Sequence, residues 1–359
     1  MLTSSKENAS RVGRLYLPHG TVETPAFMPV GTYGVVKTLS PEDIEKLGYE
    51  LILCNTYHLL LRPGEEFMKR FGGLHKFMNW NKPILTDSGG FQIMSLAKMR
   101  KIHEGGVEFR SHIDGTLYKL TPEKAVQFQK ILGVDISVAL DICPAHPASK
   151  EEISLAVERT TRWAQRSLNA REENQILFGV TQGGIYEDLR KKSIEEITSM
   201  PFDGFSIGGV SVGESKVWQH RIVEFSAPLL PKDKPRYLMG MGKPTDIIHA
   251  VRCGVDLFDC VLPTRMGRHH ALFTLSGIVN ITNSRFASLD APWDPESVFP
   301  LTAKISSAYL HHLFKIGEPL AARIASLHNL AFYERLMREI RMAIREDKWN
   351  WLEERYKNC

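Results

Sequence analysis

The sequence predicts an α/β fold, a modified (β/α)8 or TIM barrel. Short apolar runs rich in β-branched residues alternate with longer segments of helical period, which is typical of a parallel sheet whose strands are joined by helices. About eight such units occur, and eight strands close a barrel. The expected strands are Pro25–Val30, Leu51–Asn55, Ile84–Thr86, Ile136–Leu140, Ile176–Val180, Gly204–Ile207, Tyr237–Met239 and Val255–Phe258.

The segments between these strands carry helix and turn signals. Ser40-Pro41 and Thr121-Pro122 each place a capping hydroxyl before a proline, with acidic residues following, as preferred at a helix N-terminus. Residues 107–120 instead alternate around Asp114-Gly115 and predict a hairpin inserted after the third strand. The tail from Ser306 to Ile344 has the amphipathic period of helices.

Length and composition fit one barrel with additions. The chain has 359 residues, of which 43% are hydrophobic and 24% are charged, as in ordinary globular proteins. We expect residues 1–283 to form the barrel core with the active site. Residues 284–359 are expected to form a C-terminal helical subdomain that packs on this barrel.

The sequence gives no sign of a membrane protein or of an oxidising compartment. The N-terminal MLTSSKENASRVGR lacks the apolar core of a signal peptide, and no later run approaches the roughly 18 apolar residues of a membrane span. The five cysteines are scattered without a CxxC pair, so we expect reduced thiols and a cytoplasmic protein. A net charge of +4 is compatible with nucleic-acid binding but is weak evidence for it.

Polar groups recur where the expected strands end. Because the carboxyl ends of barrel strands meet at one rim, these groups should form one site. Carboxylates, an amide, glycine backbone and apolar side chains together suit a flat heterocycle with hydrogen-bonding edges, such as a purine. Each residue alone could equally cap a strand or helix, but their recurrence favours a site. They are Asp87, Phe91, Asp141, Cys143, Gln182, Gly209, Val210, Met239 and Asp259.

The stretch from Val255 to Arg268 is the most informative of these strand ends. Asp259 closes an apolar run and is followed by Arg265 and Arg268. A carboxylate in this position suits attack on the sugar of a nucleic acid, while the guanidinium groups hold phosphates. The alternative is an aspartate that only caps the next loop.

Motifs along nearly the whole chain resemble the tRNA-guanine transglycosylase family, the queuine tRNA-ribosyltransferases. This resemblance implies exchange of the guanine at the tRNA wobble position for a 7-deazaguanine, in a modified (β/α)8 barrel that forms a homodimer. The motifs are TPAFMPVGT (24–32), NTYHLLLRPG (55–64), LTDSGGFQIMSL (85–96), FRSHIDG (109–115), GVTQGG (179–184), SIGGVSVGE (206–214), YLMGMG (237–242), FDCVLPTR (258–265) and YLHHLF (309–314).

The resemblance also implies roles for the residues at the strand ends. Asp259 would be the nucleophile that attacks the ribose anomeric carbon, and Asp87 the general acid and base. Two carboxylates are also what two successive displacements at an anomeric centre require. Arg265 and Arg268 would hold the anticodon loop. The residues implied to bind the base, by its edge or its faces, are Phe91, Asp141, Cys143, Gln182, Gly209, Val210 and Met239.

Two positions favour preQ1, the aminomethyl deazaguanine, over queuine as the incoming base. Cys143 and Val212 resemble the bacterial members, whereas queuine-using members tend to have a smaller residue at the valine position. The chain also ends before the extra RNA-binding domains of archaeal relatives.

The sequence departs from the family at its structural zinc site, which reads Cys-x-Cys-x-x-Cys with a distant histidine. Ser297, Phe299 and Thr302 stand in place of the cysteines, and only His328 remains. One imidazole falls far short of the four ligands of a structural zinc, so we expect no metal and no cofactor. The side chains expected to pack this region in place of the ion are Val298, Phe299 and Leu301.

Two alternatives come from other functional classes. The chain could be a non-catalytic tRNA-binding partner subunit, although retention of both Asp87 and Asp259 argues against it. It could also be a glycosidase or metal-dependent hydrolase of a small nucleoside, but no HxH motif stands at a strand end to hold a metal.

Overall fold

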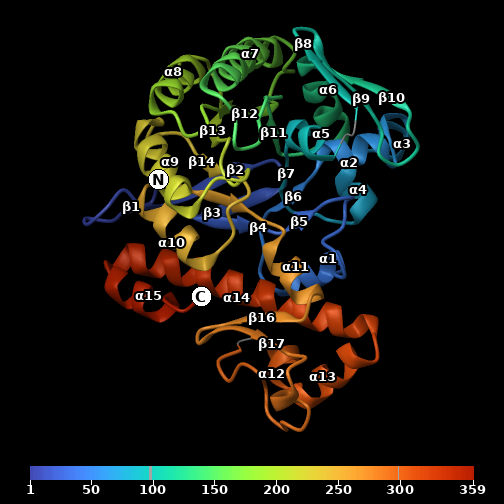
Figure 1. Ribbon diagram of the computed structural model, residues 1–359, viewed down its shortest axis with the longest axis vertical. Coiled ribbons are helices and arrows are strands. Elements are labelled where there is room, and N and C mark those ends of the chain that lie inside the picture. The colour runs from blue at the N-terminus through green and yellow to red at the C-terminus, as the bar shows by residue number, and fades with distance from the viewer. Residues whose placement is uncertain (97–98, 298) are drawn as a thin grey trace.

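The computed structural model describes residues 1–96, 99–297 and 299–359, and its centre is a parallel sheet that wraps into a barrel (Figure 1). The strands follow one another in the order β4-β15-β14-β13-β12-β11-β7-β6-β5. They are β4 (Ala26–Met28), β5 (Val30–Gly31), β6 (Ile52–Cys54), β7 (Ile84–Thr86), β11 (Ile136–Val138), β12 (Ile176–Thr181), β13 (Gly204–Ile207), β14 (Arg236–Leu238) and β15 (Leu257–Asp259).

The two ends of this order are two halves of one strand, which is how the sheet closes. β4 pairs with β15 and β5 pairs with β6, so the first strand contacts the last and the second. The halves are separated at Pro29, which has no N–H to give to a strand ladder. All eight predicted strands are therefore confirmed, with the first one broken at its proline.

The barrel is filled by apolar side chains and covered at its N-terminal end by a sheet that the sequence did not predict. Leu53, Leu85, Val138 and Leu257 point inward and are buried together. Val22, from the antiparallel sheet of β1 (Thr3–Ser4), β2 (Arg11–Leu17) and β3 (Gly20–Thr24), joins this same cluster. The covered end leaves the opposite rim, where the strands terminate, for the site.

Helices surround the barrel, and both predicted helix starts are confirmed. Ser40 caps α1 (Pro41–Lys46) in a reciprocal capping box with Asp43, and Thr121 caps α6 (Pro122–Leu132). The remaining outer helices are α2 (Thr56–Leu61), α3 (Glu65–Phe71), α4 (Leu74–Met78), α5 (Gly90–Leu96), α7 (Lys150–Asn169), α8 (Glu187–Thr198), α9 (Lys216–Ser226), α10 (Pro244–Arg252) and α11 (Leu262–Arg268).

The predicted hairpin after the third barrel strand is confirmed, and a third strand extends it. β9 (Gly106–Arg110) pairs with β10 (Leu117–Leu120) on one side and with β8 (Arg100–His103) on the other. The insert is fastened to α7, because Arg162 makes two bonds of 2.8 and 2.9 Å to the Glu104 carboxylate.

The C-terminal residues form a second, smaller core. Leu272, Trp293, Leu310 and Ile324 are buried together, apart from the barrel core. The helical tail is confirmed, while the expected boundary between residues 283 and 284 stays a prediction. The C-terminal elements are β16 (Ala271–Thr274), β17 (Gly277–Asn280), α12 (Pro300–Ala303), α13 (Ser307–Lys315), α14 (Pro319–Glu346) and α15 (Trp349–Tyr356), of which α15 places its buried side chains in the main core.

The long helix α14 joins the two cores. Its N-terminal part packs in the small core, and its later residues, such as Leu336 and Ile340, lie in the main core beside the barrel (Figure 1). In the described residues, no helix is both long enough and apolar enough to cross a membrane.

Candidate active site

Asp87 lies directly after β7, buried to 6% exposure and held by four donors. The backbone N–H groups of Thr56 and Gly89 donate to Oδ1 over 3.0 and 3.2 Å. The amides of Asn55 and Gln92 donate to Oδ2 over 2.5 and 2.8 Å. These donors fix the orientation of the carboxylate, as a group that transfers protons requires.

Asp259, at the end of β15, is half-buried and held on one side only. The Tyr237 hydroxyl and the Gly240 N–H both donate to its Oδ1, over 2.6 and 3.0 Å. Its Oδ2 has no hydrogen bond within the described residues. An oriented carboxylate with one free oxygen is suited to nucleophilic attack.

The two aspartates influence one another electrostatically. Burial is the largest cause that raises the pKa of Asp87 to about 6, and the negative charge of Asp259 raises it further against the hydrogen bonds that lower it. Burial also raises the pKa of Asp259, which Tyr237 and Gly240 partly offset. A carboxyl with a pKa near neutrality can both give and accept a proton at physiological pH.

Asp141 forms a second polar group beside this pair. The Ser88 hydroxyl donates to Oδ1 over 3.1 Å and the Gln182 amide donates to Oδ2 over 2.7 Å. Gly90 packs against this residue so closely that an added Cβ would lie 2.7 Å from the Asp141 carbonyl oxygen. The DSGG segment thus links the Asp87 loop to the Asp141 loop.

The glycine loop after β13 is pinned by a buried arginine. Arg190, on α8, donates to the carbonyl oxygens of Gly184, Gly208 and Gly209 at 2.6 to 3.2 Å. Gly209 has φ of +63°, and a Cβ there would lie 2.6 Å from the Gln182 amide oxygen. This packing brings Gln182 and Gly209 together, as expected from the sequence.

A buried glutamine holds the seam between the strands that carry Asp87 and Asp141. β7 and β11 share a single residue pair, Leu85 with Ile136. Across the seam, the Gln129 amide accepts from the Thr86 hydroxyl and the Val138 N–H and donates to the Val138 carbonyl, over 2.8 to 3.0 Å. The side chain therefore supplies bonds that the backbone ladder lacks here.

The other predicted site residues lie around this centre. Cys143 is buried, and burial raises the pKa of its thiol to about 12, so the thiol is uncharged at neutral pH. Val210 is buried as well. Met239, after β14, is half-buried, whereas Phe91 on α5 is 46% exposed and free to cover a ligand.

The two arginines after Asp259 are presented by α11. Arg265 is exposed and Arg268 is half-buried. Burial, with the charge of Arg265, lowers the pKa of Arg268. Its buried Nη1 has no hydrogen-bond partner in the described residues. A guanidinium with an unused donor is suited to an anionic ligand.

Sequence comparison places this architecture in a known family. The family described as "Queuine tRNA-ribosyltransferase" matches residues 6–359. The chain belongs to this family. It is 51% identical over 350 residues to a queuine tRNA-ribosyltransferase of Listeria welshimeri, covering 97% of this chain and 92% of the relative. It is 50% identical over 354 residues to the enzyme of the same name from Aliivibrio salmonicida, covering 98% and 94%.

The residues at the position of the family's zinc site do not fit that ion. The Ser297 and Thr302 hydroxyls bond to one another at 2.9 Å, and His328 Nε2 lies 2.7 Å from the Phe273 carbonyl oxygen. The remaining His328 nitrogen, Nδ1, is buried without a partner in the described residues, but it is one ligand where four are needed. Hydroxyls and a phenyl ring do not replace thiolates.

The packing expected to replace the ion is found only in part. Phe299 is half-buried and packs against the main core. The expectation for Leu301 is wrong, because this side chain is 45% exposed. It lies on a short helix, α12, whose inward face is taken by the buried Thr302. Val298 lies outside the described residues.

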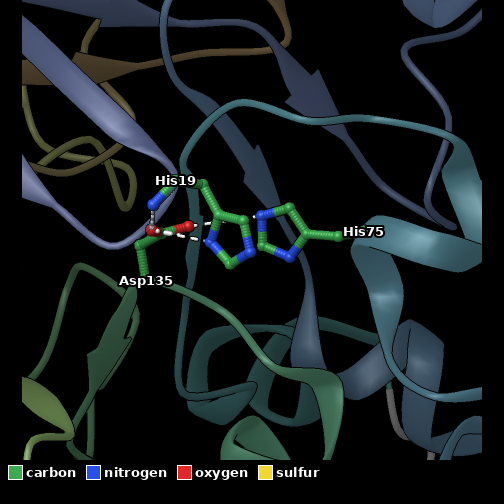
Figure 2. Close-up of side chains that lie close together, drawn as sticks. All are labelled: His19, His75 and Asp135. Carbon is green, nitrogen blue, oxygen red and sulfur yellow. Dashed lines mark hydrogen bonds and ion pairs between the residues drawn. The ribbon is translucent and has the colours of Figure 1, made fainter.

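Another group of potential metal ligands lies at the covered end of the barrel (Figure 2). Asp135 already accepts the backbone N–H groups of His19 and Ile84 and lies 3.0 Å from His19 Nδ1 and 3.3 Å from His75 Nε2. The imidazole rings stack 3.6 Å apart at 17°. A histidine nitrogen binds a metal ion in the plane of its ring, where its lone pair points. Because the two ring planes are nearly parallel and stacked, one ion cannot lie in both of them. These three residues instead attach the turn between β2 and β3 to the barrel through their hydrogen bonds and ring stacking.

The contributors to the site that were missed from the sequence include Asn55, Arg190 and Tyr237. Arg190 had a recognisable signal, because it falls on the apolar face of its helix beside Leu189 and Ile194. Tyr237 reads as an ordinary core residue of a strand, so only its contact with Asp259 reveals its role.

Proposed function

We propose that this protein exchanges the guanine at the wobble position of a tRNA anticodon for a 7-deazaguanine. In the first displacement an oxygen of Asp259 attacks the ribose anomeric carbon, the bond to N9 of guanine breaks, and Asp87 gives a proton to the departing base. In the second, the incoming base gives its N9 proton to Asp87, N9 attacks the same carbon, and the ester to Asp259 breaks. Two displacements restore the original configuration.

The observation that carries this proposal is the unequal environment of the two aspartates. Asp87 has four donors and a pKa of about 6, which suits an acid and base. Asp259 keeps one oxygen without a bond in the described residues and is oriented through the other. Different environments assign different roles to the two carboxyls.

Base recognition is proposed for the polar group around Asp141. Its carboxylate would accept from the N–H groups on the guanine edge, while Gln182 and the backbone of Gly209 and Val210 complete the in-plane contacts. Phe91 and Met239 would cover the two faces of the ring, and the neutral Cys143 would close the wall. A base removed from its stack is commonly bound in this way.

The favoured incoming base is preQ1 rather than queuine. Val212 is β-branched, and its backbone is held in place on both sides. Its carbonyl accepts from the His146 N–H, and its own N–H donates to the Glu214 carboxylate. A small aminomethyl substituent needs less room beside Val212 than a cyclopentenediol does.

Further parts of the proposal concern tRNA contact and assembly. Arg265 and Arg268 would bind phosphates of the anticodon loop, since guanidinium groups favour such contacts. The protein is proposed to act as a homodimer in the cytoplasm, without zinc or another cofactor.

The exchange assay tests the proposal. Radiolabelled guanine should enter an unmodified tRNA that has guanine at the wobble position, and preQ1 should compete more strongly than queuine. A free nucleoside should not react. Folded protein that binds this tRNA but incorporates no guanine would instead indicate a non-catalytic binding subunit, and stronger competition by queuine would overturn the preference for preQ1.

A further inference from the structure

The inserted sheet of β8, β9 and β10 has one buried and one exposed face. Its register places Val107 and Phe109 on the face that packs against the barrel. Lys101, Glu108 and Lys119 are cross-strand neighbours on the opposite face, and Arg110 follows on that face. Lys101, Arg110 and Lys119 are all exposed.

The cations of this face lack acidic partners. Glu108, the acidic residue among them, lies 3.4 Å from His103 Nε2. Within the described residues, no carboxylate lies within ion-pair distance of Lys101, Arg110 or Lys119. The anchored edge differs, because there Arg162 of α7 pairs with the Glu104 carboxylate, and Arg166 of α7 donates to the Glu104 carbonyl oxygen. The Glu104 charge at the attached edge is thus neutralised, whereas three exposed cations on the outer face have no acidic partner in the described residues, and Arg110 donates only to the Gly115 carbonyl oxygen.

The turn of this sheet is connected to the active site by a short chain of contacts. His112, in the turn between β9 and β10, lies with Nδ1 2.7 Å from the Tyr57 hydroxyl, and their rings stack. Tyr57 follows Thr56, whose N–H donates to Asp87. Figure 1 shows the sheet and α11, which carries Arg265 and Arg268, on different sides of the barrel strands.

We propose that Lys101, Arg110 and Lys119 bind the phosphate backbone of the tRNA anticodon stem while α11 holds the loop. This rests on the proposed function, which brings a phosphate polyanion to the adjacent barrel rim. Two strand spacings separate Lys101 from Lys119 by roughly 10 Å, a span from which flexible side chains reach neighbouring phosphates. Contacts of this kind position the RNA and read no base sequence.

The test uses the full-length protein with Lys101→Gln, Arg110→Gln and Lys119→Gln combined. Neutralising three phosphate contacts should reduce the slope of log affinity against log salt by about 2–3. The KM for tRNA should rise by about tenfold or more near physiological salt, while kcat at saturating tRNA stays unchanged. The matched control is Lys6→Gln, Lys130→Gln and Lys232→Gln, which removes the same charge from exposed lysines at the covered end of the barrel.

A gain-of-binding variant keeps the test decisive if the triple variant folds poorly. Glu108→Lys adds a cation at the centre of the face, so tRNA binding should tighten and its salt slope should steepen by about one. Equal slopes in the wild type, the triple variant and Glu108→Lys would overturn the proposal. The absence of guanine exchange in all variants would refute the proposed function instead, because the salt dependence of tRNA binding is read without catalysis.

Discussion

Replacing Asp87 with asparagine is expected to abolish exchange and to stabilise the fold at neutral pH. Burial and the charge of Asp259 raise the pKa of Asp87 from 3.8 to about 6. Ionising this group therefore costs the folded state about 3 kcal/mol, from roughly two pKa units at ~1.4 kcal/mol each. Asparagine resembles the protonated carboxyl, and its amide can donate to the Asn55 and Gln92 side-chain oxygens once both of these amides turn; the Gln92 Oε1 is buried and has no partner in the described residues.

The sign of this effect gives it a pH dependence. A carboxyl whose folded-state pKa is raised carries no penalty below its unfolded-state pKa of 3.8, and the penalty grows to its full size above pH 6. Asp87→Asn should therefore stabilise the protein by about 3 kcal/mol near pH 7.5 and by about 1 kcal/mol near pH 4.5. Urea unfolding followed by circular dichroism at both pH values measures the difference.

Asp43→Asn is a control of opposite sign. Burial raises the pKa of Asp43, but the hydrogen bonds from Arg323 and Ser40 outweigh it, so the net pKa is lowered. This variant should lose stability at neutral pH, and the loss should shrink as the pH falls through the folded-state pKa. If Asp87→Asn were instead destabilised near pH 7.5, the reasoning that ionised Asp87 costs the fold stability would be refuted.

Three other perturbations test separate parts of the structure. Gln129→Leu should destabilise the protein by about 3–5 kcal/mol in urea unfolding, because it leaves buried backbone groups at the seam without hydrogen-bond partners. Gln165→Leu, on an exposed helix face, should change stability by no more than about 0.5 kcal/mol. Equal losses in the two variants would contradict the role of Gln129 at the seam. Tyr237→Phe should lower kcat by about tenfold or more without weakening tRNA binding, since it removes a charge-assisted bond to Asp259, and an unchanged kcat in the exchange assay would count against it. Protein made in zinc-rich medium should contain little zinc by elemental analysis, while a variant with cysteines restored at Ser297, Phe299 and Thr302 should gain it; one tightly held zinc per wild-type chain would contradict the expected absence.

The barrel was predictable because its strands are buried on both faces and read as short apolar runs. The sheet of β1 to β3 was not, because β2 and β3 mix apolar residues with exposed polar ones such as Arg14 and Thr21. β8 escaped for a similar reason, since Arg100, Lys101 and His103 give it no apolar face that stands out. Such strands are recognisable only through their partners.

The candidate site was predictable at the level of strand ends but not of contacts. Asp87, Asp141 and Asp259 were predicted to lie at one rim because parallel strands deliver their termini there, and each does lie at or just after the end of a barrel strand. The supporting groups come from elsewhere, as Arg190 does from a helix, and sequence spacing does not encode their distance from the site. Gln129 likewise matters because the β7–β11 pairing is short, which is a property of the closed barrel.

The central claim is that Asp259 bonds covalently to the ribose during exchange. Wild-type protein incubated with the tRNA and then denatured should yield a protein–RNA adduct. Guanine added before denaturation should remove this adduct. Asp259→Asn should still bind tRNA yet form no adduct and exchange no base. Undiminished adduct or exchange in Asp259→Asn would contradict the account, and the role of nucleophile would then belong to another residue.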